Sequence, residues 1–388
     1  MKKKELSFIA IIFISLVFFL DLIFMKILGN KFSYKSICYD EITIYNYCKN
    51  SVQINYLDEK EIDKKLIKTY IDENRIPYIK GGDKILPSKA NILIIGDSFI
   101  QADEIETSKR ITEQFNRSNL SAISLGFSSW SPFQYNRLLK KNIYKKNENF
   151  LIFLMTNDFL PNYKYSTINF SEKETEYKKI FINKEKFEKT LFYKIKQFLK
   201  GNSFIFSSIS KIKKNLFNQD AASRDYLKIT DNFNIDNLND CSLINKYENK
   251  ISNLILDYIY FSKSEKCWSQ KHKKSVDHAV NLINGINNFI LPTQKVYFIL
   301  IPPGWSIRDE NLEGKTFGNY KIDKSVTITH TGLSNYLEKK LTNFYDLEPV
   351  LVKLKEKYPE SNSLYFSRDG HWTELTHSSI FKWLKEIL

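Results

Sequence analysis

Short apolar runs alternate with amphipathic stretches over much of the chain. The apolar runs lie at 92–95, 120–126, 149–158 and 295–301, and apolar residues recur with helical spacing around 107–117, 132–146 and 276–290. Short uninterrupted apolar runs are typical of strands buried on both faces of a sheet. The alternation predicts parallel βαβ units, and therefore an α/β fold with a three-layer α/β/α sandwich around a parallel sheet. A short strand, a polar loop and a terminal helix, with Ile380, Leu384 and Ile387 on one face, are expected to complete it.

Two segments depart from this pattern. Between about 161 and 270 the periodicity weakens, and we interpret this basic, aromatic stretch as an insertion that contains an amphipathic helix. The apolar residues that indicate this helix are Phe187, Leu191, Ile195 and Phe198. Residues 26–88 are expected to form a stalk or cap, with a strand over 42–48 and a charged helix over 58–73.

The N-terminal segment has the pattern of a membrane anchor. Three lysines precede a largely apolar stretch, 7–25, whose one charge, Asp21, lies near its far end. A helix needs about 20 residues to span a bilayer, and the lysines favour a cytoplasmic N-terminus. A cleaved signal peptide is the alternative, but no small-x-small site follows and no cysteine is close enough for lipidation. We expect a cytoplasmic tail, 1–6, a retained transmembrane anchor in the cytoplasmic membrane, and a single-pass protein with its remaining chain periplasmic or extracellular.

Composition and charge narrow the classes of partner. With 43% hydrophobic and 15% aromatic residues, the 388-residue chain is typical of globular proteins. The net charge of +14 comes from lysines spread along the chain with Asn, Ile and Tyr. We therefore expect solvated helix faces and attraction to an anionic membrane surface, and no nucleic-acid partner.

The even number of cysteines, four, is consistent with a chain that is exported to an oxidising compartment. Cys38 and Cys48 lie in one segment, and Cys241 and Cys267 in another, so two local disulfides are permitted; four unpaired thiols are the alternative. The cysteine spacings fit no zinc pattern and the five histidines are scattered. We expect neither a metal site nor a cofactor.

Three polar groups follow predicted strands. They are Gly-Asp-Ser at 96–98, Thr-Asn-Asp at 156–158 and Asp-Gly-His at 369–371. Ligands bind at the carboxyl edge of open α/β sheets, so these loops are expected to converge there. A nucleophilic serine needs a base, and the base needs a group that fixes its tautomer. For Ser98 the alternative is an ordinary strand-to-helix turn, in which Gly, Asp and Ser are common.

The sequence here resembles the SGNH (GDSL-type) hydrolases. The similarity lies in IGDSF, TND and DGHW, which occur in the family's order, and it covers about 89–160 and 271–388. It implies an SGNH hydrolase-like, flavodoxin-like domain over 89–388, interrupted by the insertion. The single residue between Asp369 and His371 is most similar to the branch that contains alginate O-acetyltransferase-like proteins, whose members are commonly exported and act on polysaccharide O-acyl groups.

The resemblance also implies a catalytic triad. Ser98 would be the nucleophile, His371 the general base and Asp369 the partner that orients it. A capping residue on a surface loop is the alternative for His371. We expect His377, in the predicted terminal helix, to be packed or solvent-facing.

An oxyanion hole is implied at the same place. Asn157 would donate from its side chain, together with the backbone N–H of the nucleophile. The family's usual glycine in this hole aligns with Ser129, which still offers a backbone N–H, whereas Gly126 matches an earlier and less critical position. Met155 replaces the glycine two residues before Asn157 and is expected to narrow the site. A simple turn at the strand end is the alternative for Asn157.

These features predict a serine O-acyl esterase or transferase, with O-acetyl favoured, that acts on an extracytoplasmic glycan. One alternative is a lipid esterase or thioesterase, and another is a non-catalytic glycan-binding or assembly protein on a decayed SGNH fold. The expected partners are a glycan or acylated substrate and the membrane. A membrane protein that delivers the acyl donor is a further candidate partner. Trp130 and Trp305 are expected to pack in the core or a loop rather than to form a sugar platform.

Overall fold

The structure is a computed structural model. It describes residues 16, 19–21, 33, 35–57, 65–82, 84–141, 147–161, 163–190, 192, 253–307, 316–317, 320–321, 329–359, 364–366 and 370–388. Within these ranges, no helix combines the length and hydropathy that a bilayer crossing requires. The predicted tail, 1–6, and nearly all of the predicted anchor, 7–25, lie outside the described residues.

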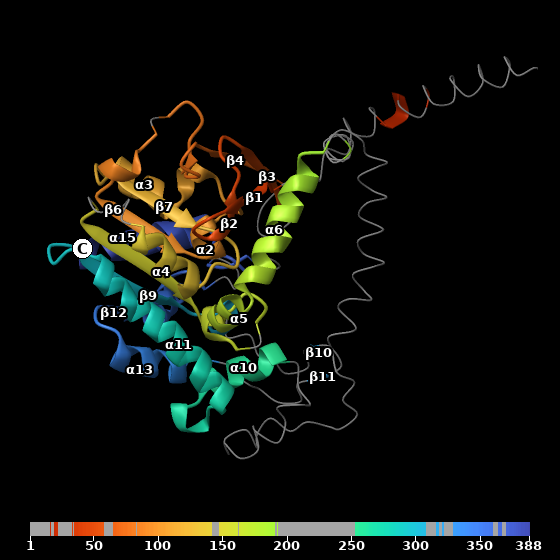
Figure 1. The fold of residues 1–388 in the computed structure, drawn as a ribbon. Coiled ribbons are helices and arrows are strands. Elements are labelled where there is room, and N and C mark those ends of the chain that lie inside the picture. The colour runs from red at the N-terminus through yellow and green to blue at the C-terminus, as the bar shows by residue number, and fades with distance from the viewer. Residues whose placement is uncertain are drawn as a thin grey trace, which may run out of the picture.

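A five-stranded parallel sheet forms the centre of the fold (Figure 1). Its strands are β6 (Ile92–Gly96), β7 (Ala122–Gly126), β8 (Asn149–Met155), β9 (Lys295–Ile301) and β12 (Phe344–Asp346). Their spatial order is β12-β9-β8-β6-β7. Successive strands are therefore added on one side of β6 (β7) and then on its other side (β8, β9 and β12), so the strand order reverses between β6 and β8. In doubly wound sheets such a reversal opens a crevice at the carboxyl ends of the two strands, where ligands bind.

Helices cover both faces of this sheet, because the inner strands β6, β8 and β9 are apolar on both sides. Alternate residues of β6 show this: Leu93 and Ile95 belong to one buried cluster, and Ile92 and Ile94 to the other. The first cluster includes residues of α4 (Pro132–Lys140), α11 (Gln270–Ile286) and α13 (Thr331–Lys340). The second includes residues of α2 (Ser98–Gln101), α3 (Ile111–Arg117), α14 (Glu348–Lys357) and α15 (Glu374–Ile387). The α/β prediction is therefore confirmed.

Strands from the N-terminal segment pack beside this sheet. A hairpin is formed by β1 (Ile37–Asp40) and β2 (Ile44–Tyr47), and a three-stranded antiparallel sheet by β3 (Val52–Leu57), β4 (Lys65–Ile71) and β5 (Pro77–Tyr78). The predicted disulfide between Cys38 and Cys48 is present and links the hairpin to the turn that follows it. Cys267 is also disulfide-bonded, and Cys241 lies outside the described residues.

The predicted charged helix over 58–73 is wrong where the structure describes it. Residues 65–71 form β4, with Ile67, Thr69 and Ile71 buried and the residues between them more exposed. This alternation has the period of a half-buried strand, and pairing with β3 fixes it. The helix was predicted from the charged residues of this stretch, and the alternation of buried and exposed positions was not recognised.

Further elements are found among the described residues. The predicted insertion contains α5 (Thr167–Glu172), α6 (Glu174–Glu188) and α10 (Asn253–Ser262), and α6 packs against β1 and β2. Of the residues that predicted an amphipathic helix, Phe187 lies on α6 and is exposed, and the others lie outside the described residues. The short elements are α12 (Gly304–Ile307), β10 (Thr316–Phe317) and β11 (Tyr320–Lys321). The described residues also form the 3-10 turns η1 (Pro87–Lys89), η2 (Thr107–Lys109), η3 (Thr156–Phe159), η5 (Glu265–Cys267) and η6 (Asn287–Phe289).

The last strand of the sheet differs from the prediction. The fifth strand is β12, whereas the predicted strand near 365 is only a bridge between Tyr365 and Trp372. The described residues 364–366, where the sequence predicts the strand, are therefore not part of the sheet. The bridge closes a loop instead, and this loop carries His371.

Candidate active site

Ser98 begins a short helix directly after strand β6, which lies between β8 and β7 in the sheet. The turn is tight, because a Cβ at Gly96 would collide with the Ile100 side chain. Asp97 is the N-cap, and its Oδ1 accepts a hydrogen bond from the Phe99 N–H at 3.0 Å. Ser98 Oγ lies 3.5 Å from Asp97 Oδ2. The expected strand-to-helix turn is therefore present, and its capping bond comes from Asp97 rather than from the Ser98 hydroxyl.

His371 is brought beside this turn by the C-terminal loop. The loop is closed by hydrogen bonds from the Phe366 N–H to the His371 carbonyl and from the Gly370 N–H to the Phe366 carbonyl. The imidazole is 21% exposed, and its centroid lies 4.9 Å from that of the Phe99 ring. The structure therefore brings Ser98 and His371 to the same carboxyl edge. Asp369, the predicted orienting residue, lies outside the described residues.

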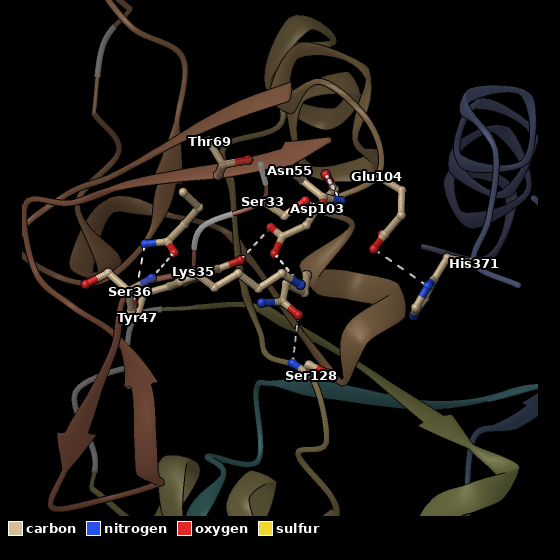
Figure 2. A network of polar contacts seen from close by, with 12 residues as sticks. Ser33, Lys35, Ser36, Tyr47, Asn55, Thr69, Asp103, Glu104, Ser128 and His371 are labelled. Carbon is tan, nitrogen blue, oxygen red and sulfur yellow. Dashed lines mark hydrogen bonds and ion pairs between the residues drawn. The ribbon is translucent and has the colours of Figure 1, made fainter. Parts of the chain in front are cut away.

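Glu104 is a site residue that the sequence analysis missed. Its Oε1 lies 3.7 Å from His371 Nδ1, and its side chain is 7% exposed. Figure 2 shows this carboxylate directed toward the imidazole from the loop that follows α2. The sequence gives no signal for this contact beyond an acidic residue shortly after Ser98, because the contact depends on how the C-terminal loop folds back.

The loop that carries Ser129 lies at the end of β7. Ser129 has a φ of +69°, in the left-handed region that favours glycine, at the position where the resemblance expects glycine. The Tyr45 hydroxyl donates to the Ser129 carbonyl at 2.8 Å, and Gln101 Oε1 accepts from the Ser128 N–H at 2.8 Å. Residues of β2 and α2 thus hold this unusual backbone conformation.

The other two predicted oxyanion residues have different surroundings. A Cβ on Gly126 would lie 2.7 Å from the Gln101 backbone nitrogen, so packing of α2 against β7 accounts for this glycine. Asn157 follows β8 in the turn Thr156–Phe159, and its Oδ1 is buried without a hydrogen-bond partner among the described residues. Met155 is buried in the core beneath this turn. Ser98 and Asn157 thus follow the two strands that flank the reversal in strand order.

Two buried carboxyl groups lie under the site. Burial raises the pKa of Asp97, against the opposing effects of the Phe99 N–H and of the His371 charge. Burial and the neighbouring Asp97 raise the pKa of Asp158 well above its usual value. Asp158 Oδ2 accepts from the Met155 N–H at 3.0 Å and from the Tyr135 hydroxyl at 3.3 Å. These bonds tie the turn after β8 to α4.

The other predicted aromatic and histidine residues have structural roles where they are described. His377 is buried and packs edge-on against Trp372, and burial lowers its pKa to about 3, so it stays neutral. Trp130 is buried, and its Nε1–H donates to the Tyr45 carbonyl at 3.1 Å. Both match the expectation of packing. The side chain of Trp305 lies outside the described residues.

Among the described residues, His330, Asp346 and Glu348 form the one group whose ligand atoms are close enough to hold a metal ion. His330 Nε2 lies 2.9 Å and 3.0 Å from the Asp346 carboxylate oxygens. Burial alone would raise the pKa of Asp346, but the hydrogen bonds and charge of His330 outweigh it and lower that pKa. Asp346 also accepts from the Glu348 N–H. These internal bonds support a structural pair at the edge strand, and we assign no metal to it.

Comparisons with known proteins add no relative. No protein-family model matches the chain. A search of curated proteins also finds no match. The functional interpretation therefore rests on the residues at the carboxyl edge of the sheet.

Proposed function

We propose that this chain is a serine O-acyl esterase or transferase with an SGNH-type, flavodoxin-like catalytic domain. The observation that carries the proposal is the position of His371 beside Asp97 and Phe99, the two residues that flank Ser98 at the crevice beside β6. The imidazole contacts the ring of the residue after Ser98, and its charge acts on the residue before it. A hydroxyl and an imidazole at the switch point of a doubly wound sheet are the parts that nucleophilic acyl transfer requires.

The proposed reaction has two balanced steps. Ser98 Oγ attacks the ester carbonyl and passes its proton to His371, which then returns the proton to the leaving hydroxyl as the ester C–O bond breaks. In the second step, water or a sugar hydroxyl attacks the acyl-serine carbonyl and gives its proton to His371. The bond between the acyl carbon and Ser98 Oγ then breaks, His371 returns the proton to Oγ, and the carboxylic acid or the new sugar ester is released. Backbone N–H groups near Ser98 and Ser129, with the Asn157 side chain, would stabilise the oxyanion. Esterase and transferase differ only in the second acceptor.

An extracytoplasmic glycan is the substrate class that we propose. The Cys38–Cys48 disulfide supports folding in an oxidising compartment. The apolar stretch 7–25 supports attachment to a membrane. Acylated glycans are ester substrates that occur outside the cytoplasm, and the resemblance to the alginate O-acetyltransferase-like branch favours an O-acetyl group.

Release of acetate from aryl acetates and from acetylated glycans by the purified full-length chain tests the proposal. Ser98→Ala and His371→Ala should each nearly abolish turnover, and the double variant should be little worse, because these groups act as a unit. Ser108→Ala, on the turn η2 of the same segment, is the matched serine control and should keep wild-type turnover. Turnover by Ser98→Ala at the wild-type rate would refute the assignment of Ser98. Absence of turnover by the folded wild-type protein would favour a non-catalytic binding protein.

A further inference from the structure

The carboxylate of Glu104 is held facing the imidazole of His371. Glu104 Oε1 lies 3.7 Å from His371 Nδ1, and the Glu104 side chain is only 7% exposed (Figure 2). A buried carboxylate is costly unless a positive or hydrogen-bonding group faces it. The separation is an ion-pair distance, and catalytic contacts of this kind commonly tighten when substrate is bound.

The loop that presents Glu104 is fixed by its neighbour, Asp103. Ala102 ends α2 with a φ of +49°, which turns the chain away from the helix. Asp103 Oδ1 then accepts from the Tyr47 hydroxyl at 2.7 Å, and Oδ2 lies 3.1 Å from Lys35 Nζ. The Asp103 carbonyl accepts from Asn55 Nδ2 at 3.2 Å. Tyr47 lies on β2, Asn55 on β3 and Lys35 shortly before β1. Figure 2 labels these residues together with Asp103.

A second anchor lies behind Asp103. The Arg110 guanidinium, 3% exposed, is 3.8 Å from the Asp103 carboxylate and donates to Thr69 Oγ1 on β4 at 2.7 Å. Asp103, the residue beside Glu104, is therefore held by groups from β2 and β3, by Lys35 and by Arg110, and Arg110 is in turn held by Thr69 on β4. A side chain carried on such a fixed loop can hold an imidazole in one orientation, which a side chain on a loose loop cannot do.

We propose that Glu104 is the positioning residue that orients His371 for catalysis, in the role that the sequence suggests for Asp369. This inference rests on the proposed function. With Nδ1 turned toward Glu104, Nε2 is the ring nitrogen that takes the proton of Ser98. The Glu104 charge stabilises the imidazolium that forms in each step. The N-terminal strands thereby become part of the catalytic apparatus, because they anchor the loop that carries the orienting carboxylate.

Charge-neutral variants of the full-length chain test the proposal. Glu104→Gln keeps the shape of the side chain and removes the charge, and we expect kcat to fall by about 10²- to 10⁴-fold, as loss of an orienting carboxylate does in serine hydrolases. The acid limb of the pH–rate profile should move to lower pH, because a negative charge no longer favours the imidazolium. Glu104→Asp, which retains the carboxylate, should keep more activity than Glu104→Gln.

Glu106→Gln is the matched control. It removes the same charge two residues along the loop, where Glu106 is 45% exposed and pairs with Lys65. We expect its kcat and pH–rate profile to equal those of the wild type. Asp369→Asn is made in parallel. A thermal melt of each variant confirms that it is folded before its rates are compared.

The outcomes separate this inference from the proposed function. If Ser98→Ala is inactive and folded Glu104→Gln has the rate and pH profile of Glu106→Gln, the Glu104 inference is overturned while the proposed function stands. The inference is likewise overturned if Asp369→Asn alone produces the loss and the pH shift. If Ser98→Ala retains full activity, the proposed function itself fails.

Discussion

The Tyr45 hydroxyl offers a direct way to perturb the loop of Ser129 without touching a reacting group. Burial raises the pKa of Tyr45 well above its usual value, so the hydroxyl remains a donor. It donates to the Ser129 carbonyl at 2.8 Å. Tyr45→Phe removes this bond and leaves a half-buried acceptor unpaired, a cost of about 1 to 1.5 kcal/mol. That cost falls on a residue with a φ of +69°, which a residue other than glycine holds only when its surroundings impose it.

A loss of about 1 to 1.5 kcal/mol corresponds to roughly a 5- to 13-fold smaller population of the competent loop. We therefore expect the rate constant for labelling by a serine-directed phosphonate, and kcat with an aryl acetate, to fall by about that factor. Loss of a whole oxyanion donor would cost about 100- to 1,000-fold. Tyr39→Phe, on the paired strand β1, is the control, because its hydroxyl makes no hydrogen bond among the described residues. A folded Tyr45→Phe protein that reacts as fast as Tyr39→Phe would refute this account of the loop.

Three further perturbations test the fold that supports the site. Replacing Cys38 and Cys48 by Ser opens a loop with a sequence separation of 10 and should lower the free energy of unfolding by about 3 kcal/mol; an unchanged urea midpoint would contradict this. Gly126→Ala places a Cβ 2.8 Å from the Ile100 carbonyl carbon, which should lower the free energy of unfolding by about 1–3 kcal/mol and slow phosphonate labelling. A wild-type melting temperature and labelling rate would contradict the packing argument. His377 has a pKa of about 3 in the folded protein, so as pH falls the unfolded chain takes up a proton at this residue before the folded protein does. The free energy of unfolding should therefore fall below about pH 6.5, by about 2 kcal/mol from pH 7 to pH 5. Chemical denaturation at the two pH values should show this loss in the wild type and not in His377→Phe.

The parts of the fold that the sequence predicts well are those with a strong local pattern. The strand β6 is apolar at every position up to its closing glycine, so burial on both faces follows directly from the residues. The same holds for β9, whose predicted and observed limits agree. The edge strand β12 has three half-buried residues and no apolar run, so it gives no comparable signal. For β4, the period of two is present, but the surrounding charges suggested a helix.

The candidate site is partly visible in the sequence for a similar reason. Ser98 and Asn157 follow strands with strong apolar patterns, and the topology places both at one edge of the sheet. Glu104 could not be predicted, because its contact with His371 depends on a C-terminal loop folding back onto α2. The support of Ser129 by Tyr45 depends likewise on a hairpin distant in the sequence. Contacts between separate loops carry no local pattern, so only the folded chain reveals them.

The central claim is that Ser98 forms a covalent acyl intermediate with the help of His371. Peptide mapping by mass spectrometry, after the full-length chain reacts with a serine-directed phosphonate, tests it most directly. We expect one adduct, on the peptide that contains Ser98, that is absent from Ser98→Ala and strongly reduced in His371→Ala. A folded wild-type protein that takes up no label, or that is labelled equally in Ser98→Ala, would contradict the claim.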